Sequence, residues 1–133
     1  MIPRKIGIVT GASGAMRLAP GLVLSPDAAF VSRTRLRDGK VPSDPIPDLA
    51  PDLAVEVLSK NNTVREMERK RRDYFDAGVR LVWIVDPVKQ TVAIYLPGAS
   101  EPTILRNDQT LTGEPVLPGF TLDLRGLFEK LAR

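Results

Sequence analysis

The segment 53–85 constrains the fold more than any other part of the chain. Residues 53–58 (LAVEVL) are apolar except for Glu56, which is the pattern of a strand buried inside a sheet. Residues 63–77 repeat apolar side chains at helical spacing, and residues 80–85 (RLVWIV) read as a second buried strand. A strand, a helix and a strand of these lengths predict a right-handed parallel crossover. The fold class is therefore α/β.

The expected helix has a start signal and a stop signal. Thr63 and Glu66 have the spacing of a capping box, in which each residue satisfies a free backbone amide of the other. Gly78 is placed where a glycine commonly ends a helix.

The rest of the chain predicts shorter elements around this crossover. Its length suits a single domain over residues 1–133, in which helices pack on a mixed sheet. We expect strands at 5–10, 22–24, 28–31, 91–96, 102–106 and 120–123, a hairpin at 17–21, a helical turn at 32–37, an extended loop at 38–52 and a helix at 124–132.

The glycine-rich segment 5–14 (KIGIVTGASG) resembles the first strand and turn of a short-chain dehydrogenase. That site needs a third glycine, a helix after the turn and an acidic residue about twenty positions further on. The third glycine and the acid are missing, and Pro20 would interrupt the helix. We interpret the segment as a short strand and a turn, whereas the dehydrogenase alternative predicts NAD(P) binding.

Composition excludes several kinds of catalytic site. The chain has no cysteine, and therefore no disulfide, thiolate nucleophile or cysteine zinc site. It has no histidine, and therefore no Ser-His-Asp triad and no imidazole ligand. Catalysis must then use carboxylates, lysine and hydroxyls, with a hard metal ion held by oxygen. A net charge of +3 permits nucleic-acid binding without establishing it.

One acidic residue stands out because burial of a carboxylate is costly unless it is paired, protonated or bound to a metal. Glu56 lies in an apolar strand, and Lys70 lies on the following helix, where it could reach back toward that strand. Asp27 belongs to an earlier segment that could pair beside this strand. Carboxylates and a lysine that converge at a sheet edge predict a Mg²⁺ (or Mn²⁺) site for phosphodiester hydrolysis.

Several motifs, in order, resemble the Uma-two family of restriction endonucleases. They are Ser25–Val31 (SPDAAFV), Pro51–Ser59 (PDLAVEVLS), Lys70-x-x-x-Tyr74, Gly78-Val79, Trp83–Pro87 (WIVDP) and Leu117–Phe120 (LPGF). The resemblance covers roughly residues 18 to 128. It implies a fold of the PD-(D/E)xK superfamily, which is a mixed sheet core flanked by helices.

The same resemblance implies roles for individual residues. Asp27 takes the place of the "PD" aspartate and Glu56 that of the "(D/E)" acid, and both are expected to bind the metal. Lys70 matches the displaced lysine of the family, because Leu58 occupies the position where the superfamily norm is lysine. Asp52 also belongs to the pattern, as a secondary metal ligand or a structural residue. The family's N-terminal helical part and its further acid have no counterpart here, since no Asp or Glu precedes Asp27.

Two functional hypotheses follow. The first is a Mg²⁺-dependent DNA endonuclease. The second is a catalytically inactive nuclease fold that serves as a DNA-binding or interaction module. We further expect a cytoplasmic protein with no membrane partner, because the chain lacks a signal peptide and any apolar run of about 18 residues. Homodimerisation is expected as one way to cover an exposed sheet edge.

Overall fold

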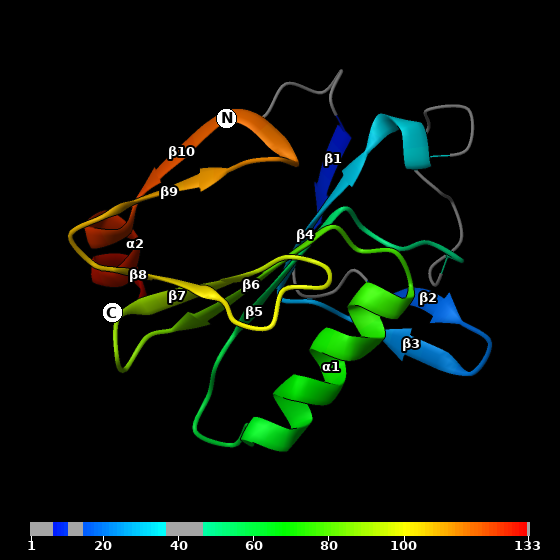
Figure 1. Ribbon diagram of the computed structural model, residues 1–133, viewed down its shortest axis with the longest axis horizontal. Coiled ribbons are helices and arrows are strands. Elements are labelled where there is room, and N and C mark those ends of the chain that lie inside the picture. Colours follow the sequence, from blue (N-terminus) through cyan, green and yellow to red (C-terminus); the bar gives the residue numbers. More distant parts are fainter. Residues whose placement is uncertain (1–6, 11–14, 37–46, 133) are drawn as a thin grey trace.

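The computed structural model describes residues 7–10, 15–36 and 47–132 and confirms the α/β class (Figure 1). A mixed six-stranded sheet, in the order β1-β4-β5-β6-β7-β8, forms the core of the fold. Two separate two-stranded sheets, β2-β3 and β9-β10, complete the described strands. The elements are β1 (Gly7–Thr10), β2 (Met16–Ala19), β3 (Leu22–Leu24), β4 (Ala28–Ser32), the 3-10 turn η1 (Arg33–Arg35), β5 (Leu53–Val57), α1 (Val64–Asp76), β6 (Leu81–Asp86), β7 (Thr91–Tyr95), β8 (Thr103–Arg106), β9 (Thr110–Gly113), β10 (Leu117–Asp123) and α2 (Leu124–Leu131).

The predicted crossover is confirmed. β5 and β6 pair in parallel and α1 connects them. The Thr63 hydroxyl accepts a hydrogen bond from the Glu66 amide at 3.1 Å, which caps the first turn. The Glu66 carboxylate instead accepts from the Asn62 side chain at 3.0 Å, so only half of the capping box forms. Gly78 follows the helix with a φ of 99°, a left-handed conformation that favours glycine.

The two faces of the sheet are covered by different parts of the chain. α1 packs on the face that carries Ala54, Val82 and Ile84, mainly through Met67 and Tyr74. The opposite face packs against the β9-β10 hairpin and α2, which supply Leu111, Leu117, Leu124 and Phe128 (Figure 1). Side chains along a strand alternate between faces, so Glu56 shares the α1 face with Ala54.

The shorter elements can be compared with the expectation one by one. β9 was not predicted, and its pairing with β10 forms a hairpin that covers one face of the sheet. The expected hairpin is confirmed, because β3 pairs with β2, and β4 pairs beside β5 as the position of Asp27 suggested. β1 lies within the strand expected at 5–10, whose first two residues lie outside the described part of the chain, as do the turn at 11–14 and most of the expected loop at 38–52.

The segment after the glycine-rich turn argues against dinucleotide binding. Strand β2 begins at Met16, where a dinucleotide site would need a helix. β1 pairs antiparallel with β4, whereas a dinucleotide-binding unit has parallel strands.

Neither described helix is long and apolar enough to cross a membrane.

Candidate active site

The three residues expected to carry catalysis line one pocket at the carboxyl end of β5. The pocket has a volume of about 250 Å³. Asp27, Glu56 and Lys70 line it, from the start of β4, from β5 and from α1 respectively. Its other lining residues are Ser25, Val57, Ser59, Asn62 and Met67.

Strand pairing brings the two acids together. β4 runs antiparallel to β5, with Ala28 opposite Val55, so Asp27 and Glu56 lie at the same end of the strand pair. The Val57 amide donates a hydrogen bond to the Asp27 carboxylate at 2.6 Å. Asp27 is otherwise exposed, whereas Glu56 is only 5% exposed. One acid therefore faces solvent at the mouth of the pocket and the other forms its inner wall.

Helix α1 places two side chains on the buried acid. The Lys70 ammonium lies 3.6 Å from Glu56 Oε1, and the Tyr74 hydroxyl donates a hydrogen bond to the same oxygen at 3.0 Å. Lys70 and Tyr74 are four residues apart, which is the spacing that puts two side chains on one helix face. The expectation that Lys70 reaches back toward Glu56 is confirmed.

Burial dominates the electrostatics of Glu56. Desolvation raises the pKa of its carboxyl above the ordinary value of 4.5. Lys70 and the hydrogen bond from Tyr74 act in the opposite direction, while the neighbouring Asp27 charge adds to the rise in the Glu56 pKa. Desolvation also raises the pKa of Tyr74, and the Glu56 charge raises it further, so the phenol stays protonated and can donate.

Of the two roles expected for Asp52, a secondary metal ligand or a structural residue, its surroundings fit the structural one. Its carboxylate lies 3.1 Å from Arg35 Nε and 3.6 Å from an Arg80 guanidinium nitrogen. The same carboxylate accepts a hydrogen bond from the Ser32 amide at 2.5 Å. Asp52 is 1% exposed and does not line the pocket. Its partners make it a structural acid of the β4-β5 pair.

Without Asp52, the site holds two carboxylates rather than three. Over the described ranges 7–10, 15–36 and 47–132, no three acidic, cysteine or histidine residues lie close enough together to hold a metal ion. Mg²⁺ is commonly held by one or two carboxylates, with water and substrate phosphate completing its octahedron. The donor chemistry of Asp27 and Glu56, beside a pocket of this size, therefore fits a divalent cation.

Other interpretations from the sequence can be compared with the structure. The Asp86 carboxylate accepts hydrogen bonds from the amides of Val88 and Lys89, which confirms it as a turn residue. Trp83 belongs to the core, where its ring stacks on Phe120 with centroids 6.1 Å apart.

The contact of Tyr74 with Glu56 was not predicted, because the tyrosine was assigned only to the apolar stripe of the helix. A buried tyrosine hydroxyl needs a polar partner, and a lone acid on the adjacent strand was the available signal.

Two comparisons with known proteins bear on this site. The Uma2 family, described as "Putative restriction endonuclease", matches residues 1–125, and this match includes the N-terminal segment that we left outside the resemblance. A crystal structure of a "putative nuclease belonging to DUF820" from Anabaena variabilis superposes with a TM-score of 0.81 at 21% sequence identity. The superposition covers 97% of this chain and 72% of the other, and it supports the fold. None of the curated proteins matches the sequence significantly. The chain therefore belongs to the Uma2 family, whose fold it shares with the Anabaena nuclease-like structure.

Proposed function

We propose that the chain is a metal-dependent endonuclease that hydrolyses phosphodiester bonds of DNA with Mg²⁺ or Mn²⁺. The observation that carries the proposal is the meeting of Asp27, Glu56 and Lys70 in one pocket. Family membership supports nuclease chemistry, and the lack of histidine and cysteine fits a mechanism that relies on oxygen ligands.

In this proposal the two acids hold the cation. When bound, such a cation polarises the phosphodiester and makes a water molecule more acidic. Glu56 would be the inner ligand, and Lys70 and Tyr74 hold its carboxylate in place through contacts with Oε1. Asp27 is fixed by its hydrogen bond from the Val57 amide, which sets the position of the second carboxylate.

In this proposal Lys70 is the protein's positively charged group beside the reacting phosphate. Lys70 lines the pocket, and its side chain is 29% exposed. A cation in that position stabilises the negative charge that builds up on the phosphoryl oxygens in the transition state. The same group can also orient the attacking water.

The test is cleavage of supercoiled plasmid DNA in the presence of Mg²⁺ or Mn²⁺. We expect nicking by the wild type and a loss of at least about a hundredfold in Glu56→Gln, Asp27→Asn and Lys70→Met, because each change removes a group that acts on the reacting phosphate. Glu101→Gln and Lys89→Met change exposed residues outside the pocket and serve as matched controls. Equal rates in the wild type and the three pocket variants would refute the proposal.

A second candidate is a DNA-binding or interaction module without catalysis. The observation that favours it is the pair of carboxylates, in place of three, within the described part of the chain. This candidate predicts DNA binding that is unaffected by Glu56→Gln and no metal-dependent nicking by any form of the protein.

The remaining proposals concern partners and place of action. We propose that the protein acts on DNA in the cytoplasm. Among the described strands, β1 and β8 form the two edges of the main sheet, and a strand edge can recruit a further strand. We propose that a second copy pairs along one of these edges, which light scattering would detect as a dimer mass.

A further inference from the structure

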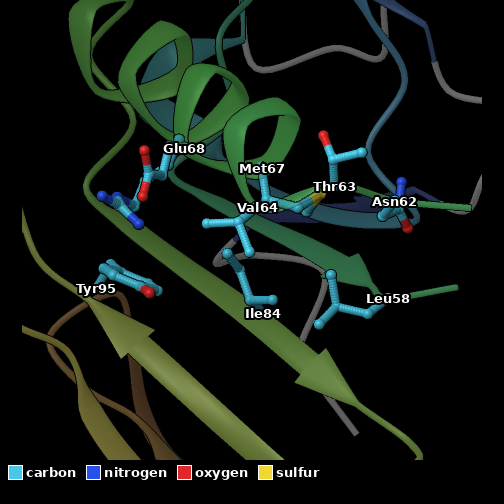
Figure 2. A pocket seen from close by; sticks show the side chains of 9 residues that line it. Leu58, Asn62, Thr63, Val64, Met67, Glu68, Ile84 and Tyr95 are labelled. Carbon is cyan, nitrogen blue, oxygen red and sulfur yellow. The ribbon is translucent and has the colours of Figure 1, made fainter. Parts of the chain in front are cut away.

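A second pocket opens beside the proposed active site, between α1 and strands β6 and β7. Figure 2 shows Val64, Met67, Ile84 and Tyr95 around it, with Leu58 at one side. Its volume is about 220 Å³. The pocket is therefore large enough for one planar ring system and too small for a stacked pair of bases.

The two pockets are neighbours. Asn62 and Met67 line both, so a single nucleotide can extend from one into the other. A phosphate placed against Lys70 would leave its own sugar and base within reach of the second pocket. The shared wall is adaptable, because methionine is unbranched and flexible.

The walls of the second pocket suit an aromatic ring rather than a phosphate. Leu58, Met67 and Ile84 provide apolar surface. The Arg71 guanidinium lies 4.2 Å from the centroid of the Tyr95 ring, and these two side chains, with Glu68 beside them, form a polar and aromatic rim. Val64 at the mouth is 77% exposed, so an apolar side chain is in place to cover an incoming ring.

We propose that this pocket receives one unpaired nucleobase of the strand whose phosphodiester lies against Asp27, Glu56 and Lys70. The inference rests on the proposed nuclease function and specifies its substrate class. A base inside a duplex is stacked and paired, so a pocket for one ring admits only a base that has left the helix. The preferred substrates are therefore single strands, loops, mismatches and frayed ends.

The probe is a short oligothymidylate, compared with an abasic oligonucleotide that carries the same number of phosphates. Ca²⁺ serves as the divalent cation in both samples. Methyl NMR follows the wild-type side chains of Leu58, Val64, Met67 and Ile84. We expect these methyl signals to shift with the oligothymidylate and to stay in place with the abasic oligonucleotide.

The matched variants are Tyr95→Ala and Leu96→Ala, which truncate a pocket side chain and a neighbouring exposed side chain outside the pocket. Stacking of one base is worth about 1–3 kcal/mol, so the wild type should bind the base-bearing oligonucleotide at least about fivefold more tightly than the abasic one. Tyr95→Ala should lose most of this ratio, and Leu96→Ala should keep it. The ratio is informative even if a variant lowers overall affinity.

Three results would overturn the inference. The first is equal affinity for the two oligonucleotides without methyl shifts, which refutes the base pocket and leaves the proposed nuclease function intact. The second is an identical set of methyl shifts with a fully paired blunt duplex, which refutes the preference for unpaired bases. The third is no binding of any nucleic acid, which refutes the pocket and the proposed function together.

Discussion

At the scale of single residues, two buried acids near each other in sequence have different tasks. Asp52 is surrounded by Arg35, Arg80 and a backbone amide, whereas Glu56 has one lysine and one tyrosine on a single oxygen. The sequence predicts the burial of Glu56 and its approach to Lys70, because both depend on short-range spacing. It does not predict the pairing of Asp52, because Arg35 and Arg80 come from segments on either side that only the folded chain brings together.

Asp52→Asn should lower the free energy of unfolding by about 2–3 kcal/mol. The change removes the buried negative charge that Arg35 and Arg80 share. Both arginine side chains are partly exposed, which brings the cost below the value for a fully buried pair. Asp48→Asn is the matched control, because its ion pair with Arg17 is exposed and should be worth less than about 1 kcal/mol. Denaturant titration of both variants gives the comparison, and equal losses would contradict the structural role of Asp52.

The raised pKa of Glu56 makes stability depend on pH. Because the folded chain holds the Glu56 proton more tightly than the unfolded chain, the free energy of unfolding falls as pH rises from about 4.5 through the raised pKa and then levels off. Glu56→Gln removes this loss, so the variant should be more stable than the wild type at neutral pH. The difference in the free energy of unfolding between Glu56→Gln and the wild type should become smaller toward acid pH.

Denaturant titration across this pH range measures the effect. Glu101→Gln changes an exposed acid and should follow the wild-type curve at every pH. A constant difference between Glu56→Gln and the wild type would show that ionisation of Glu56 does not oppose folding.

At the scale of elements, local pattern predicts the crossover well. β5, α1 and β6 appear almost where apolar runs, helical spacing and the Thr63 cap place them. The β9-β10 hairpin escapes prediction because its strand at 110–113 (TLTG) is short and polar, and because Pro118 and Gly119 indicate a turn where β10 continues. Its stability comes from packing on the sheet, which local sequence does not encode.

Thr63→Ala should destabilise the chain by about 1 kcal/mol, because the Glu66 amide loses its acceptor. Thr63→Ser keeps a hydroxyl at the same place and should retain most of the wild-type stability. Ser100→Ala, at an exposed turn, should change stability by less than about 0.5 kcal/mol. Thermal unfolding of the three variants tests the cap, and an unchanged Thr63→Ala protein would contradict it.

At the scale of the whole molecule, the candidate active-site pocket joins three segments that are distant in sequence. Asp27 immediately precedes β4, Glu56 lies near the end of β5 and Lys70 lies on α1. A ligand that contacts all three side chains therefore links these three elements. A ligand that binds the folded state alone raises stability in proportion to the logarithm of its concentration. A metal bound at this site should therefore stabilise the entire fold.

Mg²⁺ or Mn²⁺ at about a hundred times its dissociation constant should add about 2.7 kcal/mol to the free energy of unfolding. For a chain of this length that corresponds to a rise in Tm of about 8–10 °C. The rise should vanish in Asp27→Asn and persist in Glu101→Gln. Equal stabilisation of all forms would place the metal outside the pocket.

The strand pair β4-β5 is fastened at both ends by carboxylates: Asp52 accepts from the Ser32 amide at one end, and Asp27 accepts from the Val57 amide at the other. A slip of one residue would turn Glu56 toward the opposite face and move it by about 3.3 Å. The relative positions of Asp27 and Glu56 at the candidate site therefore depend in part on the arginine-bound Asp52, at the other end of the strand pair. A design that grafts this pocket onto another scaffold must therefore also include Asp52 and its partners. Without them, the register that positions Asp27 and Glu56 is no longer fixed at the far end of the strand pair.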